Sequence, residues 1–158
     1  MPGPVQIEGA LDARDLKVAI VAGRWNDFII ASLLKGALAS WARHGGVPGS
    51  LTIARVPGAF ELPVAAKRLA ATGRYDAVVA LGCVIRGDTP HFDYVAGEAA
   101  AGLTRAQPDT GAPRIFGGLT VDTVDQALER AATSRMDKGG ESMDVAIEMA
   151  NLLRQVGR

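Results

Sequence analysis

Cysteine and histidine are scarce in this chain of 158 residues, which has one cysteine and two histidines. A single cysteine, Cys83, excludes an internal disulfide, and together with His44 and His91 it gives no recognisable zinc-binding spacing. Because Cys83 lies inside an apolar run, we expect a small buried side chain rather than a thiol nucleophile. We expect no bound metal.

An excess of charge of either sign is also absent, since 17 Lys and Arg balance 17 Asp and Glu. With no basic run and no interleaving of basic and aromatic residues, the sequence does not indicate a nucleic-acid surface. No apolar stretch reaches the roughly 18 residues of a membrane-spanning helix, and the N-terminus lacks a signal-peptide pattern. With 22% charged and 48% hydrophobic residues, the composition is that of one ordinary soluble domain, which we expect to be cytoplasmic.

Apolar strand-like runs alternate with amphipathic helical patterns along most of the chain. We expect strands at residues 17–22, 51–56, 77–85 and 114–119. We expect helices that end near residues 43, 73, 106, 130 and 155, the last two beginning after Thr123 and near Glu141. This alternation predicts a flavodoxin-like three-layer α/β/α sandwich with a central parallel sheet. Residues 1–14 form an expected N-terminal arm able to pair with a sheet edge, possibly a neighbour's, and residues 15–158 form a single domain.

The segment at residues 80–95, ALGCVIRGDTPHFDYV, is the strongest candidate for chemistry. Its strand ends in a polar turn, and Thr89 and Pro90 suit the first positions of a helix, which places His91 at the helix start. Ligands of open α/β sheets bind at the carboxyl ends of strands, and unpaired helix amides there would hold a phosphate. The helix dipole disfavours protonated His91 while Asp88 and Asp93 favour it, so a pKa near neutrality is expected. An ordinary strand-turn-helix junction that binds nothing is the alternative.

Other loops at expected strand ends, at residues 23–27, 57–61 and 120–123, carry further candidates. Trp25 follows the first strand, where an exposed aromatic could stack on a flat ring. Glu61 could accept hydrogen bonds from ligand hydroxyls or cap a helix, and Phe116 in a strand could simply pack. Arg130 and Lys138 are either solvated charges or phosphate ligands. No nucleotide-binding glycine motif and no serine nucleophile elbow is present.

Several ordered sequence blocks together resemble the lumazine synthase family over nearly the whole chain. The blocks are Trp25-Asn26, VPGAFELP at 56–63, residues 80–95 quoted above, FGGLTVDT at 116–123, QALERA at 126–131 and DKGGESMDVAIEMANLL at 137–153. The resemblance implies condensation of 5-amino-6-(D-ribitylamino)uracil with 3,4-dihydroxy-2-butanone 4-phosphate. The products are 6,7-dimethyl-8-ribityllumazine, phosphate and water, in a step of riboflavin biosynthesis that requires no cofactor.

The resemblance also implies roles for individual residues. The pyrimidine and its ribityl chain would be held by the Trp25 ring, by the loop of Ala59, Phe60 and Glu61, by the backbone of Cys83, Val84 and Ile85, and by the pocket-wall residues Phe116 and Lys138. The phosphate would be held by Asp88, Thr89 and Arg130. His91 matches the proton-transfer residue of the family.

The resemblance further implies that the pocket lies between subunits. Phe116, Arg130 and Lys138 would come from the neighbour of the subunit that supplies Trp25 and His91. The resemblance implies homopentamers, which some members of the family assemble into icosahedral shells while others stop at pentamers or paired pentamers. The short link from Arg130 to Lys138 resembles that of shell-forming members, so we expect a shell, and riboflavin synthase is a possible partner. The segment ATSRMDKG departs from the usual turn of the family, which bears on assembly, and the carboxylate of Asp88 is unexpected in a phosphate turn.

Two other classes of function compete. A non-catalytic protein of the same fold could bind a flavin or lumazine, or build a shell, without turnover. A flavodoxin-like FMN carrier or a signalling receiver would need a serine- and threonine-rich phosphate loop or an acidic cluster after the first strand. Residues 23–26, Gly-Arg-Trp-Asn, supply neither.

Overall fold

A four-stranded parallel sheet forms the centre of the molecule. The computed structural model describes residues 2–87, 95–102 and 112–157. The strands β1 (Val18–Gly23), β2 (Leu51–Val56), β3 (Ala77–Leu81) and β5 (Arg114–Phe116) are arranged in the order β2-β1-β3-β5. All four run parallel, and every residue of β1 and β3 is buried. Such apolar strands need cover on both faces, which the helices provide.

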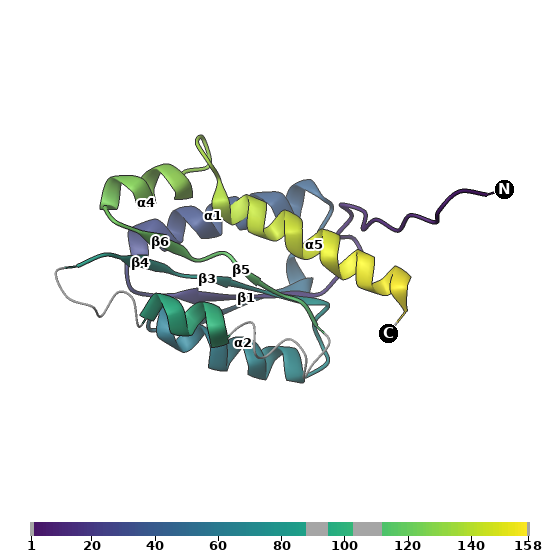
Figure 1. The fold of residues 1–158 in the computed structure, drawn as a ribbon, viewed down its shortest axis with the longest axis horizontal. Coiled ribbons are helices and arrows are strands. Elements are labelled where there is room, and N and C mark those ends of the chain that lie inside the picture. Colours follow the sequence, from purple (N-terminus) through teal and green to yellow (C-terminus); the bar gives the residue numbers. More distant parts are fainter. Residues whose placement is uncertain (1, 88–94, 103–111, 158) are drawn as a thin grey trace.

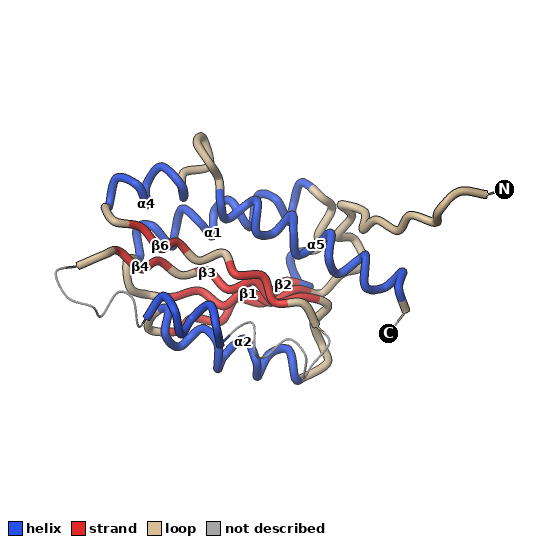
Figure 2. The backbone as a smooth tube through the Cα atoms, in the orientation of Figure 1, coloured by secondary structure: helices blue, strands red, loops and turns tan. Residues whose placement is uncertain are grey.

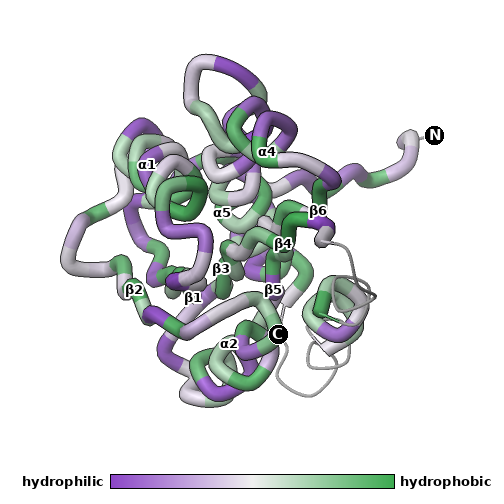
Figure 3. The backbone as a smooth tube through the Cα atoms, turned by 90° about the vertical axis from the view of Figure 1, so that its left-hand side faces the viewer, coloured by the Kyte–Doolittle hydropathy of each residue, from purple (hydrophilic) through white to green (hydrophobic). Residues whose placement is uncertain are grey.

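Helices cover the sheet on both sides, as Figures 1 and 2 show. One layer contains α1 (Asp27–Arg43), α4 (Val124–Ala131) and α5 (Lys138–Val156), packed on Val18, Ile20 and their neighbours on that face. The other contains α2 (Leu62–Ala71) and the helical residues 95–102, packed on Ala19 and Val21. Seen end-on, the apolar strands lie between the two layers (Figure 3). The predicted three-layer α/β/α fold is confirmed.

Two predicted strands are interrupted at glycines. The apolar run 77–85 divides at Gly82 into β3 and β4 (Cys83–Ile85), and the second break, at Gly117 and Gly118, separates β5 from β6 (Leu119–Val121). A Cβ on Gly82 would lie 2.8 Å from the Leu62 side chain, so helix α2 approaches too closely for a larger residue. At the second break a Cβ on Gly117 would lie 2.6 Å from the Ser142 hydroxyl oxygen. The prediction of unbroken strands at 77–85 and 114–119 was wrong, because glycines in a strand often mark such close approaches.

The interruption does not change the register between the paired segments. Ala80 pairs with Phe116 before the break and Cys83 pairs with Leu119 after it. The amide of Leu119 donates to the Gly82 carbonyl at 2.8 Å, which carries the ladder across. The strands β4 and β6 therefore extend the sheet beyond its central part. Because β6 ends at Val121, the predicted loop 120–123 begins only at Asp122.

Helix α5 begins three residues earlier than the predicted start at Glu141. Asp137 is its N-cap, and its carboxylate accepts a hydrogen bond from the Gly140 amide at 3.2 Å. The glycine pair at 139–140 resembles a loop in the sequence, yet both glycines are buried in the helix. A Cβ on Gly139 would overlap the Leu33 carbonyl of α1, so this glycine permits close packing of the two helices, while a Cβ on Gly140 would overlap the capping carboxylate of Asp137. Tertiary packing overrides the local propensity here.

The capping prediction at Thr123 is confirmed. Its hydroxyl accepts a hydrogen bond from the Gln126 amide at 3.2 Å, and the Gln126 side chain accepts one from the Asp122 amide at 2.8 Å. Helix α1 ends at Arg43 with His44 as its C-cap, as predicted. The predicted helix at 90–106 can be followed only over residues 95–102, and its expected cap at Thr89 lies outside the described residues.

The N-terminal segment is extended and mostly exposed. Its later part is held along α5, where the Asn151 side chain donates to the carbonyls of Ala10 at 2.7 Å and Asp12 at 2.9 Å. Its earlier part leaves the body of the subunit, and Val5 is 90% exposed (Figure 1). Among the described residues, no helix combines the length and the apolar character needed to cross a membrane.

Candidate active site

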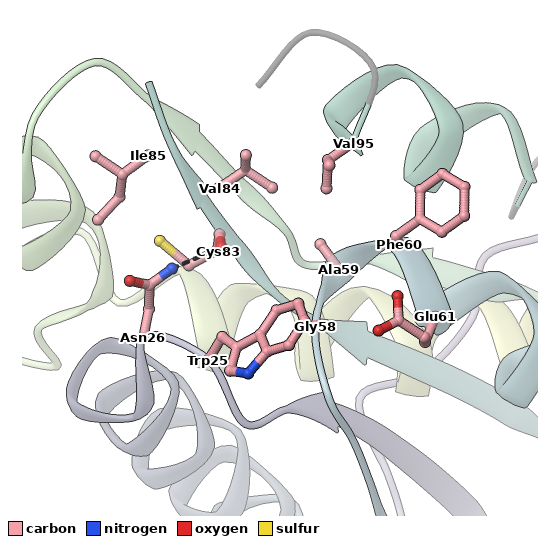
Figure 4. Close-up of a pocket in the computed structure, with 10 residues that line it drawn as sticks. All are labelled: Trp25, Asn26, Gly58, Ala59, Phe60, Glu61, Cys83, Val84, Ile85 and Val95. Carbon is pink, nitrogen blue, oxygen red and sulfur yellow. Dashed lines mark hydrogen bonds between the residues drawn. The ribbon is translucent and has the colours of Figure 1, made fainter. Parts of the chain in front are cut away.

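A cavity of about 520 Å³ opens where β1 and β2 end and beside β4. Two loops and one strand form its walls, as Figure 4 shows. The loop after β1 contributes Trp25 and Asn26, and the loop after β2 contributes residues 58–61. The third wall is β4, with Val95 from the helical segment beyond it. This is the position at which parallel α/β sheets bind ligands.

The Trp25 ring stands at the mouth of this cavity and is 64% exposed. Its amide donates to the Pro57 carbonyl at 2.9 Å, which ties the first loop to the second. One side of the indole lies against Gly58, where a Cβ would overlap the ring. The backbone of Trp25 is therefore fixed while much of the aromatic surface remains available for stacking.

Asn26 adopts a left-handed backbone conformation, with φ 62° and ψ 45°, just before α1. The sequence predicts a helix cap in this loop, and Asn26 occupies the N-cap position, but its side chain makes no capping hydrogen bond. The side-chain nitrogen Nδ2 instead donates to the Cys83 carbonyl at 3.0 Å. The sequence analysis did not predict this hydrogen bond. The local signal for an unusual backbone at this position is that asparagine tolerates the left-handed region better than most residues.

The loop after β2 supplies a carboxylate and an aromatic side chain. Glu61 is partly buried at the N-cap of α2 and makes no side-chain capping hydrogen bond, while Phe60 is 53% exposed. The Glu61 amide donates to the Gly58 carbonyl at 3.2 Å, which fixes the turn. Its carboxylate lines the cavity (Figure 4) and can accept hydrogen bonds from the hydroxyl groups of a bound molecule.

The strand β4 forms the third wall with Cys83, Val84 and Ile85. Cys83 is buried, as predicted, and burial raises the pKa of its thiol to about 11. The thiol therefore stays protonated at neutral pH and is a poor nucleophile. The wall offers apolar side chains and a strand backbone rather than a reactive group.

A second cavity, of about 310 Å³, lies beside β6 and the start of α5. It is lined by Phe116, Gly117, Gly118, Leu119, Thr120, Arg130, Lys138, Glu141 and Ser142. Lys138 pairs with Glu141 at 2.9 Å, and Arg130 donates to the Gln126 carbonyl at 3.2 Å. Phe116 is 37% exposed, with its ring over Gly118. Two cations beside one carboxylate leave this cavity suited to an anion.

The residues predicted from the sequence thus fall into two groups. The first cavity contains seven of them: Trp25, Ala59, Phe60, Glu61, Cys83, Val84 and Ile85. The second contains Phe116, Arg130 and Lys138, and the two cavities share no lining residue. The predicted residues Asp88, Thr89 and His91 lie outside the described residues. Within the described part of the chain, no group of three or more His, Cys, Asp or Glu side chains could hold a metal ion.

Comparison with known proteins gives a consistent result over nearly the full length. The family model for 6,7-dimethyl-8-ribityllumazine synthase matches residues 15–154. The 6,7-dimethyl-8-ribityllumazine synthase of Chlorobium luteolum is 52% identical over 151 residues, which cover 96% of this chain and 97% of that protein. This chain therefore belongs to the 6,7-dimethyl-8-ribityllumazine synthase family.

Proposed function

We propose that the protein is a 6,7-dimethyl-8-ribityllumazine synthase of riboflavin biosynthesis. It would condense 5-amino-6-(D-ribitylamino)uracil with 3,4-dihydroxy-2-butanone 4-phosphate, giving the lumazine, phosphate and water. The observation that carries this proposal is the family match across residues 15–154 together with 52% identity to a named synthase. The first cavity supports it, because an exposed indole, a carboxylate and a strand backbone suit a flat polar ring with a hydroxylated chain.

The ring of the pyrimidine substrate would lie against Trp25 and beside the β4 backbone. Stacking of a flat heterocycle on an aromatic side chain is worth about 1–3 kcal/mol. The backbone of β4 would read the polar edge of the ring, and Glu61 would accept from ribityl hydroxyls. Binding therefore needs no metal and no cofactor in this proposal.

The phosphate of the second substrate would be held by Arg130, Asp88 and Thr89. The substrate amine attacks the ketone, a Schiff base forms with loss of water, phosphate leaves, and the ring closes with loss of a second water. Arg130 would stabilise the departing phosphate, and His91 would transfer protons. Holding two reactants together can contribute about 7–11 kcal/mol to catalysis, so we assign most of the rate enhancement to proximity.

We further propose that the complete site lies between two subunits. The support is the separation of the two cavities, one with the surfaces for the heterocycle and the other with Arg130 and Lys138. Phe60, which lines the first cavity, is an exposed apolar side chain. Phe28 and Val64, in the first turns of α1 and α2, are exposed as well. A contact that joins the first cavity of one copy to the second cavity of another copy is heterologous, and repeated contacts of that kind form a ring when their rotation closes. Pentamers, and an icosahedral shell of pentamers, are the assembly we propose.

The N-terminal arm would take part in this assembly. Among the described residues, β2 pairs with β1 alone, so its other edge is open, and Ile53 is exposed there. The arm, residues 1–14, could add to this edge in a neighbouring subunit through Val5 and Ile7. A cytoplasmic location, a single domain over 15–158 and association with riboflavin synthase belong to the same proposal.

Direct assay tests the proposal. The purified protein is mixed with both substrates, and lumazine formation is followed by absorbance against a control without enzyme. Product formation that saturates in both substrates is the expected result. A folded, oligomeric sample that gives no acceleration would instead favour a flavin-binding or shell-forming protein without turnover.

A further inference from the structure

Asn26 connects two walls of the first cavity that are 57 residues apart in the sequence. Its backbone makes the turn from Trp25 into α1, in a left-handed conformation that most side chains avoid. Its carbonyl accepts hydrogen bonds from the amides of Ile29 and Ile30 at 2.9 and 3.0 Å, so the backbone alone starts the helix. The side chain is therefore not required for helix initiation.

The side chain is used at the cavity instead. Figure 4 shows the Asn26 amide extended towards the Cys83 carbonyl, to which it donates at 3.0 Å. Cys83 is buried, and a buried carbonyl left without a partner costs about 1–3 kcal/mol. This hydrogen bond fixes the start of β4 relative to the loop that holds Trp25.

Trp25 has two further constraints, both from the loop after β2. Its amide donates to the Pro57 carbonyl, and its ring rests on Gly58. These contacts fix the indole against one wall, but neither sets its position relative to β4. Among the described residues, the hydrogen bond from the Asn26 side chain joins the loop that holds Trp25 directly to β4.

We propose that Asn26 is a positioning residue that sets the spacing between the Trp25 ring and the β4 backbone, between which a planar heterocycle is held. This inference rests on the proposed function. Its loss would weaken binding of the pyrimidine, while binding of the phosphate substrate, which involves Arg130, would be unaffected.

Asn26→Gly is the first test variant, because glycine keeps the left-handed backbone and removes only the side chain. Asn26→Asp is the second, since it keeps the shape but places a carboxylate against the Cys83 carbonyl. One lost hydrogen bond corresponds to about a five- to tenfold rise in the KM for the pyrimidine. We expect this rise in both variants, with the KM for the butanone phosphate unchanged within about twofold.

A readout without turnover separates this inference from the proposed function. Trp41, the second tryptophan, is 2% exposed, so iodide quenching of fluorescence reports on Trp25. We expect a changed quenching constant in both variants, and weaker binding of 5-amino-6-(D-ribitylamino)uracil alone in a fluorescence titration. Equal changes in both KM values, or a loss of thermal stability with wild-type quenching and binding, would assign Asn26 a purely structural role and overturn the proposal. If Asn26→Gly fails to fold, the same readouts on Asn26→Asp decide.

Discussion

Replacement of Gly58 by alanine should move the Trp25 ring without straining the backbone. Gly58 has φ −153° and ψ −173°, an extended conformation that alanine adopts freely. A Cβ there would lie 2.8 Å from Cζ3 of Trp25 and closer still to the neighbouring ring atom. Real Cβ contacts essentially never fall below 3.0 Å, so the indole has to swing away.

Displacement of the Trp25 ring should affect substrate binding more than the stability of the fold. Because Trp25 is 64% exposed, displacing it removes little buried surface, and the free energy of unfolding should fall by less than about 1 kcal/mol. Loss of stacking should cost binding about 1–3 kcal/mol, which is a rise of about 5- to 150-fold in the KM for the pyrimidine. The KM for the butanone phosphate should change little.

The control is Gly49→Ala, where a Cβ meets nothing within 4 Å. Steady-state kinetics with each substrate varied in turn, together with urea denaturation, measure both effects. A Gly58→Ala enzyme with an unchanged pyrimidine KM would refute the assignment of Trp25 as the stacking surface. A fall of several kcal/mol in stability would show that the ring is part of the packing instead.

Three further outcomes are expected. Gly139→Ala should lower the free energy of unfolding by about 1–3 kcal/mol relative to Gly49→Ala in urea denaturation, because its Cβ would overlap the Leu33 carbonyl of α1; an unchanged midpoint would contradict the close packing. Cys83 should react slowly with a thiol reagent at pH 8 and faster only towards pH 11, because its pKa in the folded protein is raised from 9.0 to about 11. The contribution of the protonated thiol to stability is therefore present below pH 9 and is lost as the pH rises through about 11. Rapid labelling of the native protein at pH 7 would show an exposed thiolate instead. His91→Ala should slow lumazine formation by about 10²–10⁴-fold at most without abolishing it, because the variant would still hold the two substrates together. Complete inactivity of the folded variant would show that proton transfer, rather than proximity, supplies most of the rate enhancement.

The sequence predicts the layers of this fold well because each strand and helix carries its own periodic signal. A short buried run such as residues 18–22 is typical of a strand covered on both faces, and the pattern of α1 is amphipathic. The errors lie where a distant element decides the local structure. Gly82, at the break between β3 and β4, packs against Leu62 of α2. Gly139, in a glycine pair that resembles a loop in the sequence, lies in the first turn of α5 and packs against the Leu33 carbonyl of α1.

The site was predictable to a different extent. Trp25 and Glu61 could be placed at the ends of strands from topology alone, and they line one cavity. The hydrogen bond from Asn26 to Cys83 could not be predicted, because it joins residues 57 positions apart whose separation in space depends on how the loop after β1 lies against β4. Local sequence indicates a cap or a turn at Asn26, and only the folded chain shows what its side chain contacts.

If both cavities build one lumazine synthase site across two subunits, hybrid assemblies of two different variants should recover activity. Glu61→Ala and Arg130→Ala subunits, each nearly inactive when assembled alone, are unfolded together and refolded at a one-to-one ratio. Random mixing in a ring leaves about a quarter of the interfaces with both residues intact, so activity should return to about a quarter of the wild-type level. Mixed assemblies, verified by native mass spectrometry, that stay as inactive as either parent would contradict the account.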